Sequence, residues 1–195
     1  PPKLAPHQIV IVPIIPNDKD KDSVMKVVNQ LNDSLSEFRV IIDDRSEVSP
    51  GFKFNEWEQK GVPLRVEVGP KDIEKNTILV SRRDDESKNS YPMDDVQNTI
   101  KKLLDEIQDN LYKNSENTLK KNMTHVESFS ELIEVLNSKK GFVSCFWKEN
   151  KEDELKIKEE TTATLRCYPL ENTDSEKAVN SDSENGNFAI FSKAY

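Results

Sequence analysis

Glu58 and Arg65 are the two side chains in this sequence whose types and spacing could recognise a nucleic-acid base. Glu58 falls in a short predicted helix, and Arg65 falls in the strand predicted to follow it. An arginine can donate to the O6 and N7 edge of guanine, and a carboxylate can accept from its N1 and N2 donors, so the pair suits unstacked guanines. A surface ion pair is the commoner explanation of such a pair, and the residues alone leave both explanations open.

The pair lies within residues 43–72, a stretch that alternates charged residues with residues that favour turns. Three of the five glycines fall here, at Gly51, Gly61 and Gly69, and prolines lie beside two of them. Turn chemistry explains each glycine singly. Their clustering suggests a backbone that is held close to a ligand.

Other kinds of catalytic or binding site lack their usual residues. No phosphate-binding glycine loop of either common type occurs, which argues against NTP hydrolysis. His7 and His125 have no nucleophile motif nearby, so we expect surface histidines. Cys145 and Cys167 are too few for a zinc site, which needs about four ligands, and we expect two buried thiols on strands.

Composition and charge restrict the compartment and the partners. The 195 residues carry a net charge of −8, so the chain as a whole repels nucleic acid and anionic membranes, and any RNA site must be local. The longest apolar run, residues 9–15, is too short to span a membrane. Two cysteines give no disulfide framework. We therefore expect a soluble cytoplasmic protein with no membrane or DNA partner.

The elements that must position the pair begin with a strand, a helix and a strand. Residues 8–15 form a continuous apolar run, apolar residues then recur at helical spacing from residue 24 to residue 38, and residues 39–43 return as a second strand. This order favours a parallel pair with a crossover helix. It places Asp43, Asp44 and Arg45 at the carboxyl end of a strand, where open α/β sheets usually bind ligands.

The remaining pattern predicts an α/β domain that closes near residue 112, followed by a second set of elements. The first part contains a helix at 52–60, a strand at 64–68, a helical turn at 70–74, a strand at 77–82, a polar loop at 84–91 and a helix at 96–111. The second contains helices at 128–136 and 153–160, strands at 141–147, 163–169 and 188–191, and an acidic loop at 171–187. Residues 112–122 either continue the preceding helix or act as a connector.

Seven motifs, in order, give the sequence a family resemblance. They are LAPHQIVIVPI, IIDDR, PGFKFNEWEQKGVPLRVEVGPKDIE, ILVSRRD, KKGFVSCFW, EETTATLRC and the terminal FSKAY. Together they resemble the carboxyl-terminal half of a prolyl-tRNA synthetase of the archaeal and eukaryotic type, a class II enzyme. The likeness is weakest at residues 112–122 and 171–186.

The resemblance implies a fold and a division into domains. It implies an anticodon-binding domain at residues 1–112, built as a five-stranded mixed sheet with flanking helices. A helical connector at 113–140 and a small α/β carboxyl-terminal domain at 141–195 would follow.

The resemblance also implies site residues, because the family recognises the second and third anticodon bases, both guanine in proline tRNA, with charged residues of the longest motif. The matching positions are Glu58, Arg65 and Lys71 as leading residues and Asp44, Arg45, Lys53 and Phe54 as supporting contacts. Lys71 could equally anchor a phosphate. The family's terminal tyrosine directs its carboxylate toward the catalytic domain, which implies a linking role for Tyr195.

One expected departure concerns zinc. Many relatives bind zinc through four cysteines in the last domain, and those positions here hold Lys148 and Asp153 and fall near Ala178 and Ser181. Cys145 and Cys167 do not occupy ligand positions. We therefore expect the domain to fold without metal, on a core that consists of Phe142, Phe146, Cys167, Phe188 and Phe191.

The activity that the resemblance implies belongs to a longer protein. Proline–tRNA ligases use ATP and Mg²⁺ in a catalytic domain that precedes this segment, and its motifs are absent here. We expect this chain alone to be inactive and to need no cofactor. Its implied partners are tRNA(Pro) and the catalytic domain of the same chain, within an enzyme that forms a homodimer.

Two other classes of function stay open. An interaction module with an anticodon-binding-like fold, which is not an enzyme, would show no preference among tRNAs. A free-standing α/β enzyme that uses carboxylates such as Asp43, Asp44 and Glu58, together with a metal, would show activity that tRNA does not affect.

Overall fold

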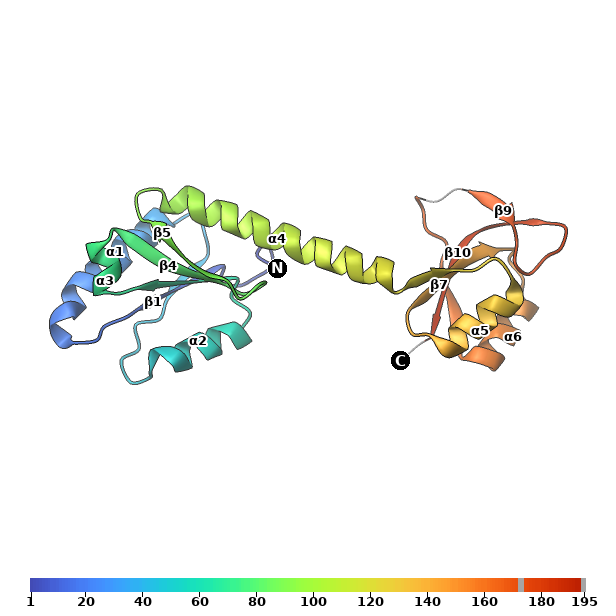
Figure 1. The fold of residues 1–195 in the computed structure, drawn as a ribbon, viewed down its shortest axis with the longest axis horizontal. Helices are drawn as coiled ribbons and strands as arrows, with labels where there is room; N and C mark the ends of the chain where they lie inside the picture. The colour runs from blue at the N-terminus through green and yellow to red at the C-terminus, as the bar shows by residue number, and fades with distance from the viewer. Residues whose placement is uncertain (172–173, 194–195) are drawn as a thin grey trace. The chain divides into compact units, whose positions relative to one another are not determined.

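The computed structural model describes residues 1–171 and 174–193, which form two units, Pro1–Asn114 and Ser115–Tyr195 (Figure 1). The division falls within helix α4 (Val96–Lys121). Tyr195, for which the family resemblance implied a linking role, lies outside the described residues. No helix in the described part of the chain is long and apolar enough to cross a bilayer.

The first unit contains a five-stranded mixed sheet with the strand order β2-β1-β3-β4-β5. Strand β1 pairs in parallel with β2 and β3, and β4 pairs antiparallel with β3 and β5. The predicted parallel pair and the predicted mixed sheet are therefore confirmed. The strands are β1 (Ile9–Pro13), β2 (Val40–Ile42), β3 (Leu64–Val68), β4 (Thr77–Arg82) and β5 (Lys88–Pro92).

Strand β5 corrects the prediction of a polar loop at residues 84–91. It lies at the edge of the sheet and pairs Lys88 with Ser81 and Pro92 with Thr77. Four of its five residues are exposed, so it lacks the apolar alternation that marks a half-buried strand. It contributes the fifth strand of the sheet.

Helices cover the two faces of this sheet unequally, and Figure 1 shows α2 on the side away from α4. The helices are α1 (Lys21–Ser34), which follows the short 3-10 helix η1 (Asp18–Asp20), α2 (Pro50–Gln59), α3 (Pro70–Glu74) and α4. Apolar residues of α1 and α4 form the main core with Leu64 and Val66 of β3. On the opposite face Trp57 of α2 packs with Val10 and Val12 of β1.

The alternation along β3 directs two charged residues to the α2 face. Leu64, Val66 and Val68 are fully buried in the main core, so Arg65 and Glu67 between them point to the other side. Their neighbours in register on β1 are the residues that Trp57 covers. Polar side chains therefore lie on a sheet face beside α2.

The second unit contains another five-stranded sheet, with the order β6-β7-β10-β8 and β9 paired with β10. Strands β6 and β7 are parallel, and the other pairs are antiparallel. Trp147, Phe191, Leu132 and Ile157 are the largest buried side chains. The elements are β6 (Met123–His125), α5 (Phe129–Ser138), β7 (Phe142–Trp147), α6 (Lys151–Thr161), β8 (Ala163–Cys167), β9 (Ser175–Lys177) and β10 (Asn185–Lys193).

The stretch predicted as a connector, residues 113–140, contains more than a helix. Helix α4 continues to Lys121, β6 then joins the second sheet, and α5 packs Leu132 and Leu136 into the core of that unit. The acidic loop at 171–187 likewise contains β9 and the start of β10. Strands of three residues, such as β6 and β9, are too short to show a periodic signal.

The predicted core of the second unit needs one correction. Phe191 is fully buried and Phe142, Phe146 and Phe188 are half-buried, but Cys167 is exposed. Cys167 is the last residue of β8, which lies at the edge of the sheet. The expectation of two buried thiols is therefore wrong for Cys167 and right for Cys145.

Candidate nucleic-acid interface

Arg65 and Glu58 form an ion pair on the α2 face of the first sheet. Nη1 of Arg65 lies 2.8 Å from Oε1 of Glu58, and the guanidinium lies 4.1 Å from the ring centre of Phe54. Only 12% of the Arg65 side chain is exposed, against 55% for Glu58. The structure therefore brings three of the predicted residues together.

The start of α2 explains why Phe54 and Glu58 lie on the same side as Arg65. The Ser49 hydroxyl accepts from the N–H of Phe52, and Pro50 occupies the first turn, so the helix begins at Pro50. Residues four apart share a helix face, which aligns Phe54 with Glu58. Gly61, at φ +78°, then turns the chain into β3.

Glu67, Ser81 and Lys88 complete this cluster and were not among the predicted residues. Glu67 is 5% exposed and accepts from Nε of Arg65 at 3.2 Å and from Nζ of Lys88 at 2.9 Å. Nη2 of Arg65 lies 3.2 Å from the Ser81 hydroxyl. The alternation of β3 would have indicated Glu67, which is two residues after Arg65. Lys88 gave no such signal because β5 was not predicted.

A cavity of about 430 Å³ opens beside this cluster. Four cations and two carboxylates contribute to its wall, and three of the cations, Arg65, Arg82 and Lys88, are ion-paired with carboxylates. It thus offers hydrogen-bond donors, the exposed Glu58 carboxylate as an acceptor, and an aromatic ring nearby. These are the groups that recognition of an unstacked base requires. Its lining consists of Glu58, Arg65, Ser81, Arg82, Arg83, Glu86 and Lys88.

Three of the other predicted residues lie around Asp43 instead. Asp43 is 4% exposed and accepts from Nε of Arg45 at 2.8 Å and from the Trp57 indole at 2.8 Å. Nζ of Lys53 donates to the Asp43 carbonyl at 3.0 Å. Hydrogen bonds from Arg45, supported by Trp57 and Lys53, lower the pKa of Asp43 to about 2. Arg45 and Lys53 therefore hold the β2–α2 connection, while Asp44 beside them is exposed.

Lys71 lies apart from both groups. It is exposed on α3, whose Ile73 packs against the main core on the opposite face of the sheet. Arg65 is the second residue of β3, and α3 follows the end of that strand. Lys71 is available to a ligand, but the ion-paired cluster does not include it.

The four positions that the resemblance aligned with zinc ligands lie near one another without a zinc donor set. Asn180 joins them: its Nδ2 donates to the Lys148 carbonyl and to Oδ2 of Asp153, both at 2.9 Å, and its Oδ1 accepts from the Lys148 N–H at 3.0 Å. A lysine, a carboxylate, Ala178 and Ser181 do not supply the thiolates and imidazoles that structural zinc takes. In the described ranges, no three or more His, Cys, Asp and Glu side chains are grouped to hold a metal ion.

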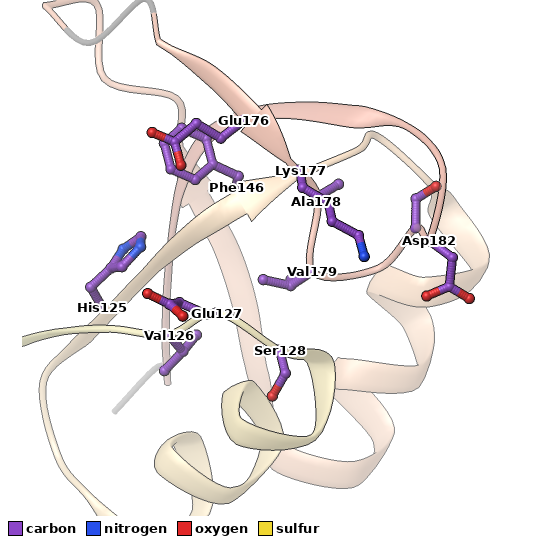
Figure 2. Close-up of a pocket in the computed structure, with 11 residues that line it drawn as sticks. His125, Val126, Glu127, Ser128, Phe146, Glu176, Lys177, Ala178, Val179 and Asp182 are labelled. Atoms are coloured by element: carbon purple, nitrogen blue, oxygen red, sulfur yellow. The ribbon is translucent and has the colours of Figure 1, made fainter.

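The second unit has a cavity of about 480 Å³ beside this loop, and Figure 2 shows most of its lining side chains. Three carboxylates, from Glu127, Glu176 and Asp182, line it together with Lys177 and His125. Nδ1 of His125 lies 3.2 Å from the Ser144 hydroxyl. An acidic wall does not suit a phosphate, so this cavity is a poor candidate for a nucleic-acid site.

Two family models match the chain over most of its length. Residues 8–103 match the anticodon binding domain, and residues 129–195 match the carboxyl-terminal domain of prolyl-tRNA synthetase.

Curated relatives and a solved structure agree with both models. A proline–tRNA ligase of Roseiflexus sp. (strain RS-1) is 42% identical over 200 residues, which cover all of this chain and 41% of that protein. A proline–tRNA ligase of Natranaerobius thermophilus is 41% identical over 172 residues, which cover 88% of this chain and 35% of that protein. A crystal structure of prolyl-tRNA synthetase from Cryptosporidium parvum, complexed with L-proline and AMP, superimposes with a TM-score of 0.90 at 36% identity, over 100% of this chain and 42% of that one. The chain thus spans about two fifths of the relatives' length.

Proposed function

The chain belongs to the prolyl-tRNA synthetase family and matches the carboxyl-terminal part of its members, which contains the anticodon-binding domain; we propose that it binds the anticodon of tRNA(Pro) through the cluster around Glu58 and Arg65. The observation that carries this proposal is the ion pair itself. In this pair the Arg65 guanidinium, which can donate to guanine, lies 2.8 Å from the Glu58 carboxylate, which can accept from guanine. The guanidinium lies over the ring of Phe54, and it lines the same cavity as the carboxylate.

Recognition proceeds by exchange of partners. A guanine that enters the cavity donates from N1 and N2 to the exposed Glu58 carboxylate, while Arg65 donates to O6 and N7. Glu67 stays hydrogen-bonded to Arg65, so the arginine is not left uncompensated. A base without these donors and acceptors still disrupts the Glu58–Arg65 ion pair, but it forms no hydrogen bonds that replace it. Each good base contact contributes about 1–3 kcal/mol of discrimination.

The remaining predicted residues take supporting roles. Lys71 and Asp44 are exposed and contact the anticodon loop, Lys71 as either a base or a phosphate contact. Arg45 and Lys53 act through the β2–α2 connection that they hold around Asp43. Tyr195 links this part to the catalytic domain.

In the whole protein, this part selects the tRNA and another part performs the reaction. The catalytic domain uses ATP and Mg²⁺ to activate proline and transfer it to tRNA(Pro), within a cytoplasmic homodimer. The present chain needs no cofactor, binds no zinc and forms no prolyl-adenylate by itself. Its contribution is binding energy that an incorrect tRNA does not supply.

The test is binding of this chain to a tRNA(Pro) transcript and to the same transcript with the second and third anticodon guanines replaced, at one stated salt concentration. We expect the replacement to weaken binding about tenfold or more. Arg65→Lys keeps the charge but loses the planar fork and the stack on Phe54, so it should weaken binding to the natural transcript and abolish the difference.

The matched control is Lys26→Ala, because Lys26 is an exposed cation on α1, which covers the other face of the sheet. It should leave the ratio of the two affinities unchanged. Equal binding of both transcripts by the natural chain would defeat the proposal and favour a protein-interaction module with the same fold.

A further inference from the structure

The largest cavity of those described in the second unit has a basic wall. It measures about 890 Å³ and opens between the end of α5, the start of β7 and the ends of β8 and β10. Four cations, Lys139, Lys140, Arg166 and Lys193, contribute to its lining. Among the described residues that line it, none carries a carboxylate. In a chain with 36 acidic and 28 basic residues, this is an unusual concentration of one sign of charge.

These cations are also free of ion pairs. Across residues 1–171 and 174–193, no carboxylate oxygen lies within 4.0 Å of the side-chain nitrogens of Lys139, Lys140, Arg166 or Lys193. By contrast, Arg65 and Arg82, which line the cavity beside Glu58 in the first unit, are both ion-paired. The charges of the basic cavity are therefore available to a ligand from outside the described chain.

The frame that carries these cations is fixed by close contacts. Gly141 has a φ of +120°, and a Cβ there would come within 2.2 Å of the Asn122 carbonyl oxygen, so the turn that follows the two lysines fits tightly against the end of α4. The Ser192 hydroxyl donates to the Gly141 carbonyl at 2.9 Å. Nε of Arg166 donates to the Ser192 carbonyl at 3.2 Å, which leaves its other nitrogens to the cavity.

We propose that this basic cavity binds phosphates of the RNA backbone and forms a second RNA contact of the chain, separate from the anticodon site. The proposal rests on the proposed function, since it assumes that tRNA is the RNA in question. Lysine and arginine neutralise phosphates without regard to base sequence. The half-buried ring of Phe142 lines the same cavity and gives it an apolar surface on which a base can pack.

An acidic protein segment is the competing occupant, and the volume and lining favour RNA. A cavity lined by four cations and the ring of Phe142 suits the phosphates and bases of RNA. The chain as a whole repels RNA at net charge −8, so binding requires a local site that overcomes this repulsion.

The experiment compares the 195-residue chain with the variant Lys139→Gln/Lys140→Gln in binding to the tRNA(Pro) transcript at several salt concentrations. Both lysines are exposed, so the variant should fold like the natural chain. We expect about a tenfold loss of affinity at moderate salt and a salt slope that is shallower by about 1 to 2, since each phosphate contact contributes roughly 0.7 to 0.9 to the slope.

The matched control is Lys151→Gln/Lys158→Gln, which removes the same charge from exposed positions of α6 in the same unit. It should have less than a threefold effect and leave the slope unchanged. Equal effects of the two double variants would mean general charge repulsion and would overturn the proposal. No effect of either variant would also overturn it and leave the cavity to an acidic protein surface.

The transcript with replaced anticodon guanines separates this proposal from the proposed function. The Lys139→Gln/Lys140→Gln variant should weaken binding to both transcripts by the same factor, because phosphate contacts carry no base information. If the natural chain binds both transcripts equally, the proposed function fails. The basic cavity would still be supported by the loss specific to this variant.

Discussion

Glu67 accepts a hydrogen bond from Nε of Arg65 at 3.2 Å, with only 7% of its side chain exposed. The same carboxylate accepts from Lys88 at 2.9 Å, so one buried anion fixes two cations at the edge of the cavity. Glu58, which binds the other side of Arg65, is more than half exposed. Of the two carboxylates, Glu67 is the fixed partner and Glu58 is the one a ligand can displace.

The first prediction concerns Glu67→Gln. An amide of the same shape can still accept from Arg65, but it no longer compensates two cations, so the guanidinium loses its fixed orientation. We expect discrimination between the natural and the guanine-replaced transcripts to fall about tenfold, while affinity for the replaced transcript stays the same or rises. The measurement is the ratio of the two dissociation constants.

Glu74→Gln serves as the control, since Glu74 is an exposed carboxylate on α3. A uniform gain in affinity for both transcripts, equal to that of Glu74→Gln, would show that Glu67 acts only through net charge.

The second prediction concerns the stability of the first unit in acid. The pKa of Asp43 is about 2 in the folded chain, against an ordinary value of 3.8, because the ionised carboxylate accepts from Arg45 and Trp57. A lowered pKa contributes stability that is complete above pH 4 and is lost as the pH falls toward 2. The contribution is about 2 kcal/mol, at about 1.36 kcal/mol per pKa unit.

Urea unfolding between pH 2 and pH 7 checks this prediction. Asp43→Asn should lower the free energy of unfolding by about 2 kcal/mol at pH 7, and the difference from the natural chain should shrink below pH 4. Asp44→Asn is the neighbouring control, because the Asp44 side chain is exposed. Parallel losses by the two variants, or a difference for Asp43→Asn that stays constant down to pH 2, would contradict the assignment.

The sequence predicted the main elements of the first unit because its buried segments are strongly periodic. Strands β1 and β3 and helix α1 bury clear apolar patterns, and the βαβ order determines that β1 and β2 are parallel. The edge strand β5 and the short strand β6 could not be predicted in this way. Their pairing is decided by neighbours distant in sequence, and their own residues are mostly polar.

The candidate site was predictable to a similar extent. Glu58, Arg65 and Phe54 follow from helix and strand periodicity together with the family motif. The family motifs also contain Arg45, in IIDDR, and Lys53, in the longest motif, and the fold uses both around the buried Asp43. Sequence spacing does not distinguish a cation that faces a ligand from one that faces a buried carboxylate. That difference depends on which face of α2 packs against the sheet.

The third prediction concerns the two thiols. Cys145 is fully buried, and burial raises the pKa of its thiol to about 12, whereas Cys167 is exposed at the end of β8. A disulfide reagent such as Ellman's should therefore modify one thiol per folded chain quickly and the second only after unfolding. Cys167→Ser should abolish the fast reaction and Cys145→Ser should retain it. Two fast thiols in the natural chain would contradict the buried position of Cys145.

The fourth prediction concerns Asn180, whose hydrogen bonds join Lys148 and Asp153 in the second unit. Its amide bonds Lys148 through both main-chain groups and bonds the Asp153 carboxylate. Asn180→Asp removes both donated hydrogen bonds and sets a carboxylate against Asp153. We expect a loss of about 1–2 kcal/mol in the free energy of unfolding, measured from the fluorescence of Trp147 in the same unit.

A second substitution makes this prediction specific. In the double variant Asn180→Asp/Asp153→Asn, the new amide at position 153 can donate to the new carboxylate, so part of the loss should be recovered. If the hydrogen bonds around Asn180 hold this loop without a metal, a chelator should leave the melting temperature of the natural chain unchanged. Stoichiometric zinc in chelator-washed protein, or additive losses from the two substitutions, would show that the unit is held together in another way.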